Sequence, residues 1–503
     1  MKKLTEKINN LCGQRWFPLL FVPVAFVFLL FFSITTSPLY VYEGTDSAVF
    51  KTMGMVILQG RTPYVDQFDH KGIVLYLINA LGQWIIPGRM GIFTLQVVGM
   101  SVALFFMFKT ARLFTTPSKA ALAIFIALFF YTGVIAGGNL EEEWSVYFFS
   151  ISLYIACQYV LQEKEGSCFS KQMLLMGILF ALTFFIRPND AVAQVGGATV
   201  GILLYTLKSK DYRSFFIQTA FFLIGTTLIT VPILFYLSRR NALDDMWYAM
   251  IVFNSEYAGG IKTLLVSMLT HNKLTLLLVF VTLWTLVFFS KQKNTLWVLI
   301  PVCLLQNLLI GTRYYEHYFI VLMPTICILA AVSMDRPRES QIIALTVLLL
   351  TPFISDRQIP LQTAQKSKYY LELVFTQKHP LSNKNRTKVY HELKTLIDKI
   401  PFEKTDSIWN YNLSGWIIPF FDGLVYNHIV QCNEIIVANS ERIKKSDNLN
   451  TVNPPYIIAR HTDPWTEKDS ILLNNYSLIG KSDTNICKIE LFARKDLSDD
   501  VEE

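Results

Sequence analysis

Long runs of apolar residues, separated by short polar segments, fill the chain up to residue 355. A transmembrane helix needs about 20 apolar residues, with about 17 to 25 as the usual range. Eleven runs meet this length or come close to it, which predicts an α-helical polytopic membrane protein of about eleven transmembrane helices. We place these spans at residues 17–38, 90–108, 120–138, 143–162, 172–186, 191–207, 214–237, 274–290, 295–312, 317–334 and 340–355.

The first run has no charged residue from Trp16 to Tyr42 and follows the basic segment MKKLTEKINNLCGQR. It lacks a small-residue cleavage site, so we expect a retained signal anchor. Another uncharged run, Gly72–Gly88, lies between Lys71 and Arg89. If the N-terminus is cytoplasmic and this run lies along the outer interface, the inward loops hold more Lys and Arg than the outward loops. A crossing would reverse that ratio, so we predict an interfacial or re-entrant helix for Gly72–Gly88.

Two further segments extend this layout. Residues 46–60 predict a second helix at the outer surface, because apolar residues recur along it and Gly60 with Pro63 supplies a stop. From Asp356 the chain becomes polar over a length too great for a linker and with a composition too mixed for disorder. There TKVYHELKTLIDKI has a helical pattern, and the short apolar runs typical of strands lie in SIWNYN, EIIVAN, PYIIAR and CKIELFAR.

These patterns predict two domains. The first is a transmembrane domain at 1–355 with an outer catalytic loop at 39–89, and the second is an α/β domain at 356–503. Eleven crossings from a cytoplasmic N-terminus put the α/β domain outside the cytoplasm. There Cys432 and Cys487 are able to form a disulfide.

Composition narrows the class of protein. The chain is 52% hydrophobic and 17% charged, which excludes an ordinary soluble enzyme. Its net charge of +7 is explained by cations at the cytoplasmic ends of the spans, so it does not imply a nucleic-acid partner. The seven cysteines show no CxxC and no Cys/His spacing, so they predict no metal site.

Ionisable residues are concentrated in the stretch YVYEGTDSAVFKTMGMVILQGRTPYVDQFDHKGIVLY, residues 40–76. Such groups beside a span are costly next to lipid, so they usually face a cavity or water and mark a functional site. The alternative is an ordinary solvated loop. Other outward segments are GGNLEEEW, RPND at 187–190 and GTRYYEHY at 311–318. In GGNLEEEW the three glutamates open the fourth span, where they would also favour the positive end of a helix.

This layout resembles the GT-C superfamily of integral-membrane glycosyltransferases. The shared features are a first span, an outer loop with an early Asp, two surface helices, further spans and an outer C-terminal domain. Within it, FDHKGIVLY resembles a segment of the bacterial aminoarabinose transferases and the protein O-mannosyltransferases. The sequence departs from these relatives at Ser47, where they often have a second acid, and at Gly72-Ile73, where they have a Pro pair.

The resemblance implies inverting transfer of a sugar from a polyprenyl-phosphate donor to an envelope glycan, lipid or protein at the outer face of a bacterial inner membrane. An acceptor hydroxyl needs a carboxylate to take its proton, and Asp46 lies where the family keeps this general base. Asp66 and Asp69 in the same loop are rivals, or one of them orients a neighbour. Cations stabilise the charge that develops on the leaving phosphate, and the candidates are Lys71, Arg313 and His317.

Other roles stay open at this stage. Glu141, Glu142 and Glu143 fall where relatives place a second acid, so one of them is expected to contact the sugar or a cation. No cofactor is required, although carboxylate and histidine groups are also ligands of a divalent ion. Two other functions remain alternatives. A transporter of lipid-linked sugars predicts charges buried mid-span and internal repeats, and neither is evident. An O-antigen-type polymerase would not need an acid-rich first loop.

Overall fold

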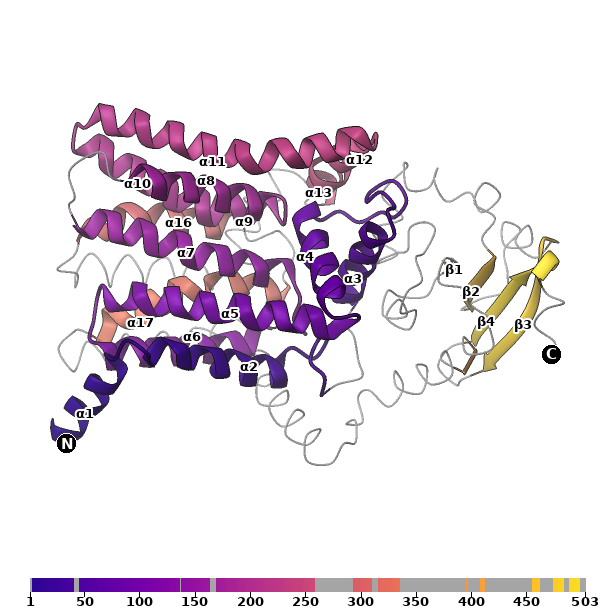
Figure 1. Ribbon diagram of the computed structural model, residues 1–503, viewed down its shortest axis with the longest axis horizontal. Helices are drawn as coiled ribbons and strands as arrows, with labels where there is room; N and C mark the ends of the chain where they lie inside the picture. The colour runs from indigo at the N-terminus through magenta and orange to yellow at the C-terminus, as the bar shows by residue number, and fades with distance from the viewer. Residues whose placement is uncertain are drawn as a thin grey trace.

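The computed structural model describes residues 2–39, 45–135, 137–162, 169–257, 293–309, 315–334, 395–396, 408–411, 455–461, 474–483 and 488–497. Most of these residues form helices that run side by side in one bundle (Figure 1). The apolar runs that fall on described residues are helices of the bundle, as the hydropathy pattern predicts. Two of the predicted spans, 274–290 and 340–355, lie outside the described residues.

The first half of the bundle has short breaks between its helices. A basic helix, α1, is followed by the 3₁₀ turn η1 and by α2, and the chain bends by 82° between α1 and the segment that follows it. The bounds are α1 Lys2–Cys12, η1 Phe17–Leu20, α2 Phe21–Phe32, α3 Thr45–Leu58, α4 Ile73–Ile85, α5 Arg89–Arg112, α6 Pro117–Val134, α7 Glu141–Gln162 and α8 Ser170–Phe184.

The second half contains several irregular turns. The π-helical turn η2 joins α9 to α10, and a second π turn, η3, lies between α12 and α13. The bounds are α9 Pro188–Asp190, η2 Ala191–Gly196, α10 Gly197–Lys208, α11 Tyr212–Arg239, α12 Leu243–Trp247, η3 Tyr248–Phe253, α13 Asn254–Tyr257, η4 Lys293–Thr295, α16 Leu296–Leu309, η5 Glu316–Leu322 and α17 Met323–Met334.

Six helical segments of the described part are long and apolar enough to cross a membrane, and a seventh is added if the bent segment at the N-terminus is one span. The six are 89–112, 117–134, 141–161, 188–208, 212–239 and 317–334. The spans predicted at 172–186 and 295–312 correspond to α8 and α16, which are apolar but shorter. The chain is therefore a mostly helical protein with several helices able to span a membrane.

Small residues let neighbouring helices approach closely, as is common between helices in membranes. A Cβ atom at Gly177 of α8 would lie 2.0 Å from the Phe222 carbonyl oxygen of α11, and one at Gly225 would lie 2.0 Å from the Leu174 carbonyl oxygen. At Gly54 of α3 an added Cβ would lie 2.7 Å from the Ala80 nitrogen of α4. Glycine is thus required where α8 meets α11 and where α3 meets α4.

The helices α3 and α4 lie across one end of the bundle, transverse to the long helices (Figure 1). This confirms helices in both segments that the sequence predicts. With 13 residues, α4 is about 20 Å long, well short of the roughly 30 Å hydrocarbon core. Its exposed face is apolar and includes Leu77, Leu81 and Trp84, whereas Asn79 and Gln83 are buried. The length and the exposed apolar face favour the predicted interfacial position.

The described residues of the C-terminal segment include a mixed four-stranded sheet in the order β1-β2-β4-β3. The first pair is parallel and the other two pairs are antiparallel. The bounds are β1 Ile408–Tyr411, β2 Tyr456–His461, β3 Tyr476–Asp483 and β4 Lys488–Arg494. Three of the predicted strands are confirmed, and β3 was not predicted. The predicted strand EIIVAN and most of the predicted helix lie outside the described residues, as do Cys432 and Cys487.

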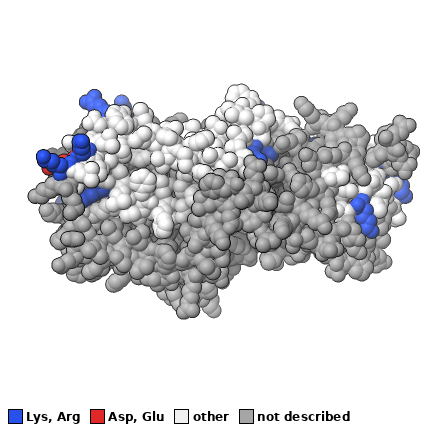
Figure 2. All heavy atoms as spheres, turned by 90° about the horizontal axis from the view of Figure 1, so that it is seen from below, with Lys and Arg blue, Asp and Glu red and all other residues white. Residues whose placement is uncertain are grey.

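Positive charge is concentrated at the end of the bundle opposite α3 and α4. The helices α5 and α10 end there with Lys109, Arg112 and Lys208. On the face that Figure 2 draws, Lys and Arg gather at the end where α1 lies, and few appear along the pale flank. This distribution agrees with the predicted cytoplasmic N-terminus, because basic residues favour the cytoplasmic side.

Candidate active site

The loop between α3 and α4 is held in shape by its own polar groups. The Asp66 Oδ2 atom accepts a hydrogen bond of 2.6 Å from the Thr62 backbone nitrogen, and the Tyr64 nitrogen donates to the Gln67 carbonyl over 2.9 Å. Gly60 and Tyr64 both have positive φ, 74° and 71°. A bulky residue such as Tyr rarely adopts this conformation, so the loop holds Tyr64 in a strained position. Asp66 therefore stabilises the turn of this loop.

Two main-chain hydrogen bonds dock the end of this loop on the segment between α8 and α9. The Gly72 nitrogen donates to the Ile186 carbonyl over 3.0 Å, and the Val74 nitrogen donates to the Phe185 carbonyl over 2.9 Å. A Cβ atom at Gly72 would lie 1.9 Å from the Phe185 oxygen. A proline at position 72 would lack the donor, so the departure from the family's Pro pair has a structural reason here. The docking places Lys71 beside the RPND segment.

Two tyrosine hydroxyls hold the main chain of Lys71. The Tyr64 hydroxyl donates to the Lys71 carbonyl over 2.8 Å, and the Tyr76 hydroxyl accepts from the Lys71 nitrogen over 3.0 Å. The Tyr76 hydroxyl also lies 2.9 Å from the Lys71 carbonyl and 2.8 Å from Asp69 Oδ2, either of which can accept its proton. Tyr76 is fully buried. The main chain of Lys71 is therefore fixed, and its side chain extends from a rigid backbone.

Asp69 and His70 form a pair next to this lysine. The His70 Nδ1 atom is 3.4 Å from Asp69 Oδ1. Burial alone would raise the pKa of Asp69, but the hydrogen bonds and charges of His70, Lys71 and Tyr76 outweigh it and hold the pKa below its ordinary value. Burial and the Lys71 charge lower the pKa of His70. The Asn254 side chain donates to the His70 carbonyl over 2.9 Å, so the α12–α13 segment packs on this part of the loop.

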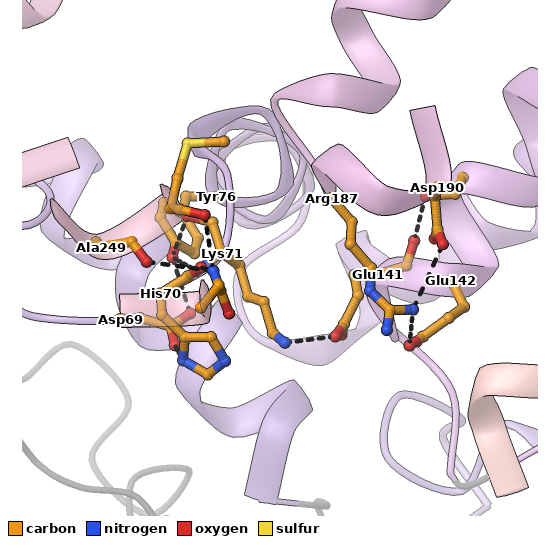
Figure 3. Close-up of polar contacts among 12 residues, drawn as sticks. Asp69, His70, Lys71, Tyr76, Glu141, Glu142, Arg187, Asp190 and Ala249 are labelled. Carbon is orange, nitrogen blue, oxygen red and sulfur yellow. Dashed lines mark hydrogen bonds and ion pairs between the residues drawn. The ribbon is translucent and has the colours of Figure 1, made fainter. Parts of the chain in front are cut away.

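The three consecutive glutamates at the start of α7 face three different sets of partners, and Figure 3 shows the first two of them, Glu141 and Glu142. Lys71 Nζ lies 2.7 Å from Glu141 Oε1, and Arg187 Nη1 lies 2.5 Å from Glu142 Oε1. The two carboxylate oxygens of Glu143 accept hydrogen bonds from three donors. These are the Gln96 amide, the Asn139 backbone nitrogen and the Tyr147 hydroxyl. All three carboxylates are buried. Successive residues of an α-helix are rotated by about 100°, which separates the three side chains.

The ion pair with Glu141 determines the protonation state of Lys71. Burial alone would lower the pKa of the Lys71 ammonium group, but the Glu141 carboxylate outweighs it and holds the pKa above its ordinary value. Lys71 is therefore a permanent cation at neutral pH. It carries its charge at the end of the bundle where α3 and α4 lie.

Arg187 is a second cation of this cluster, with only 10% of its side chain exposed. It lies 3.5 Å from Asp190 Oδ1, and its guanidinium carbon is 4.4 Å from the centre of the Tyr318 ring. Glu142 Oε2 and Asp190 Oδ2 are buried, and neither has a hydrogen-bond partner among the residues that the structure describes. Such buried acceptors are uncommon, and they mark this part of the cluster as polar and incompletely satisfied.

His317 and Asp46 lie at two other edges of the cluster. The His317 ring stacks on Tyr315 with centroids 5.6 Å apart, and it is close enough for its charge to act on Glu141. Asp46 lies in the first turn of α3, and its side chain is exposed. Desolvation by the surrounding protein, together with the charges of Glu141 and Asp69, raises the pKa of Asp46 to about 6, against the opposing effect of Lys71.

The structure thus brings together most of the residues that the sequence singles out. Asp46, Asp69, Lys71 and Glu141 interact electrostatically, and Glu142 joins them through Arg187. Asp66 and Glu143 are engaged in local hydrogen bonds, and Arg313 lies outside the described residues. Sequence reasoning missed Arg187, Asp190, Tyr64 and Tyr76 as members of the cluster. The signal that could have found Arg187 and Asp190 is RPND, a charged segment between two apolar runs.

Among the residues that the structure describes, no three His, Cys, Asp or Glu side chains gather in a way that could hold a metal ion. The carboxylates of the cluster are instead distributed among Lys71, Arg187, Tyr76 and His70.

The arrangement of the helices defines the class of fold. The structure is similar to a crystal structure of ArnT from Cupriavidus metallidurans bound to undecaprenyl phosphate, with a TM-score of 0.56 and 12% sequence identity over 95% of this chain and 98% of that chain. The chain has the fold of the GT-C glycosyltransferases, as the sequence predicts. An oligosaccharyltransferase, AglB from Archaeoglobus fulgidus in complex with an inhibitory peptide and a dolichol-phosphate, gives a TM-score of 0.41 and 13% identity over 88% of this chain and 69% of that one.

The sequence itself gives the family. Residues 19–371 match the model of the competence-induced protein Ccs4 N-terminal domain, and the chain belongs to this family. The match covers the described helices from α2 to α17 and extends a short way beyond α17. The comparison with curated proteins gave no match.

Proposed function

We propose that this protein transfers a sugar from a polyprenyl-phosphate donor to an acceptor at the outer face of a bacterial inner membrane, with inversion at the anomeric carbon. The acceptor is a cell-envelope glycan, a lipid or a protein. The observation that carries the proposal is the meeting of Asp46, Lys71 and Glu141 at one end of a GT-C bundle. The structure of ArnT with undecaprenyl phosphate supports the class of donor.

Asp46 is the proposed general base. It takes the proton of the acceptor hydroxyl as the hydroxyl oxygen attacks the anomeric carbon, and the bond from that carbon to the phosphate oxygen breaks in the same step. A pKa of about 6 suits this role, because the carboxylate is ionised at neutral pH yet still basic. Asp69 is less suited, since it is buried and accepts a hydrogen bond from Tyr76.

Lys71 is the proposed partner of the leaving phosphate. The bond electrons pass to the phosphate oxygen, and a fixed cation stabilises the charge that develops there. The two tyrosines that hold the Lys71 main chain keep this cation in place, and Glu141 keeps it charged. Arg313 and His317 are proposed to complete the phosphate site, and Glu142 with Arg187 borders it. Glu143 is proposed to be structural, because its hydrogen bonds to α5 and α7 occupy it.

The proposed topology has eleven spans, a transmembrane domain at 1–355 and an extracytoplasmic α/β domain at 356–503. Two observations support it. The basic ends of α5 and α10 lie opposite α3 and α4, as expected if α3 and α4 face outward. The described strands combine one parallel and two antiparallel pairs, which fits an α/β domain.

The direct test uses purified protein in lipid nanodiscs, a panel of synthetic undecaprenyl-phosphate hexoses and pentoses, and an envelope extract of a deletion strain as acceptor. Released undecaprenyl phosphate is measured by mass spectrometry. Asp46→Asn should reduce transfer at least about 10²-fold, the lower end of general-base effects, while the protein still binds undecaprenyl phosphate. Asn suits the start of a helix about as well as Asp, so this variant should fold.

Asp66→Asn is the matched control. Its amide oxygen can still accept the Thr62 hydrogen bond, so transfer should stay near that of the wild type. If Asp46→Asn transfers normally while Asp66→Asn or Asp69→Asn is inactive, the base is not Asp46. Efficient transfer from a water-soluble nucleotide sugar would contradict the proposed donor class.

A further inference from the structure

A buried asparagine, Asn139, connects the helix that carries Asp46 to the rest of the bundle. Its amide nitrogen donates to Ser47 Oγ over 3.0 Å and to Asn79 Oδ1 over 2.9 Å. Its amide oxygen accepts from Trp144 Nε1 over 3.0 Å. These partners lie on α3, α4 and α7. The side chain of Asn139 thus uses both amide protons and its oxygen in bonds to three helices.

The backbone around Asn139 is built for this contact. Gly137, Gly138 and Asn139 have successive positive φ angles of 99°, 88° and 57°. Glycine adopts this conformation freely, and Asn tolerates it better than most residues. A Cβ at Gly138 would lie 2.0 Å from Ser33 Oγ, so no side chain fits there. The Thr35 hydroxyl donates to the carbonyls of both glycines over 2.9 Å, which anchors the turn next to α2.

The other end of the turn is fixed by Glu143. Its Oε2 atom accepts from the Asn139 backbone nitrogen over 2.8 Å, and the same carboxylate accepts from the Gln96 amide of α5. Asn139 is fully buried. Because a buried polar group without partners is costly, this arrangement is defined in position and orientation.

We propose that Asn139 is a positioning residue for the transfer reaction and acts on Asp46 through Ser47. Ser47 follows Asp46 directly in α3, and it is buried where Asp46 is exposed. The Asn139 amide therefore fixes the first turn of α3 against the start of α7. The start of α7 carries Glu141, which forms the ion pair with Lys71. The distance between the base and the phosphate-binding cation is set by this bond. The inference rests on the proposed function, because it assigns Asp46 the role of base.

The position of Ser47 supports this interpretation. The resembling family often has a second acid there, whereas this chain has a neutral hydroxyl that accepts from an amide. An Asn donor and a Ser acceptor make a neutral pair that adds no charge beside Asp46. Asn79, the other acceptor of the Asn139 amide, donates to the Leu75 carbonyl of its own helix over 2.9 Å, so α4 is fixed by the same group.

The test compares Ser47→Ala, Asn139→Gly and the double variant in nanodiscs. Gly at 139 keeps the positive φ angle accessible, so the variant loses the side chain without imposing backbone strain. Turnover is measured as release of undecaprenyl phosphate from the sugar donor that the wild type uses, per folded molecule. Donor-site binding is measured with undecaprenyl phosphate itself. A displacement of about 1 Å near the chemistry can cost about 10²-fold in rate.

We expect kcat to fall about 10-fold or more in both single variants, with KM and undecaprenyl phosphate binding unchanged. The double variant should be no slower than Asn139→Gly, because Asn139→Gly already removes the bond that Ser47→Ala breaks. Tyr159→Phe is the matched control. It removes a half-buried hydroxyl that bonds Thr206 of α10 and Gln218 of α11, away from Asp46, so it should lower the unfolding temperature without changing kcat.

Three results would overturn the inference. If Asp46→Asn is inactive while Ser47→Ala and Asn139→Gly keep wild-type kcat, Asn139 has no positioning role and the proposed function stands. If the two changes reduce kcat additively, they act independently and not through one bond. A wild-type rate for Asp46→Asn would instead reject the base assignment, and the role of Asn139 with it.

Discussion

The docking of the Lys71 loop on the RPND segment predicts the effect of a single methyl group. The backbone of Gly72 has φ −80° and ψ 149°, which any residue adopts without strain. By backbone conformation alone, Gly72→Ala should stabilise the protein by about 0.4 to 1 kcal/mol, since alanine restricts the unfolded chain. The contacts oppose this, because the new Cβ would lie 1.9 Å from the Phe185 oxygen and 2.1 Å from its carbon.

Relief of this clash requires the two segments to separate by about 1 Å, the difference between 1.9 Å and a contact distance of 3.0 Å. Separation weakens the hydrogen bonds of Gly72 to Ile186 and of Val74 to Phe185, each worth about 1 kcal/mol. Overpacking itself costs about 1 to 3 kcal/mol. The net loss of stability is about 3 kcal/mol. Lys71, one residue away, moves with the loop, so affinity for undecaprenyl phosphate and turnover should both fall, the latter by up to about 10²-fold.

The assay is thermal unfolding in detergent together with titration of undecaprenyl phosphate. Gly60→Ala is the matched control from the same loop. Gly60 has φ 74°, and no atom of the described part of the chain lies within 4 Å of its added Cβ, so alanine there costs about 1 to 2 kcal/mol of backbone strain without a clash. Both variants should unfold at lower temperature, but only Gly72→Ala should lose phosphate affinity. Wild-type stability and affinity in Gly72→Ala would refute the docking of Lys71 through the Phe185–Ile186 backbone.

Four further outcomes are expected. Transfer should decline as pH falls through about 6, because the base must be ionised and its pKa is raised to that value; a flat profile between pH 5 and 7 argues against Asp46. Glu141→Gln should move this acid limb to lower pH, since the Glu141 charge contributes to the raised pKa; an unchanged limb shows that the two groups are uncoupled. Lys71→Met should reduce turnover at unchanged protein level; wild-type turnover would make Lys71 an interfacial anchor. Alkaline phosphatase fused after Leu361 should be active; an inactive fusion with an active cytoplasmic reporter at the same point rejects the topology.

The elements that the sequence predicts well are those whose signal is local. Apolar runs define the described helices of the bundle, and the apolar pattern of 46–60 with its Gly60 stop gives α3 to within a few residues. The charge of Lys71 beside a span indicates that this residue belongs to the candidate site. The strand β3 was missed because YSLIGKSD has little apolar alternation and contains a register shift at Gly480.

The contacts that were missed depend on segments far apart in the chain. Arg187 enters the cluster because the backbone at Phe185 and Ile186 accepts hydrogen bonds from Gly72 and Val74, and no local pattern announces such a contact. Asn139 could have been suspected from GGN, three residues that tolerate positive φ immediately before a helix. Its partners Ser47 and Asn79 could not be found this way, because neither has a sequence signal of its own.

The three glutamates of α7 have a consequence for how the length of this chain can change. Each carboxylate meets its partner through its angular position on the helix, so one residue inserted or deleted before Glu141 turns the whole set by about 100°. In most helices such a frameshift would replace every contacting side chain by a different type. Here the repetition of one residue type means that, after a shift by one position, two of the three partners again face a glutamate. The run EEE is therefore tolerant of errors in length at the point where the spacing of the loop matters most.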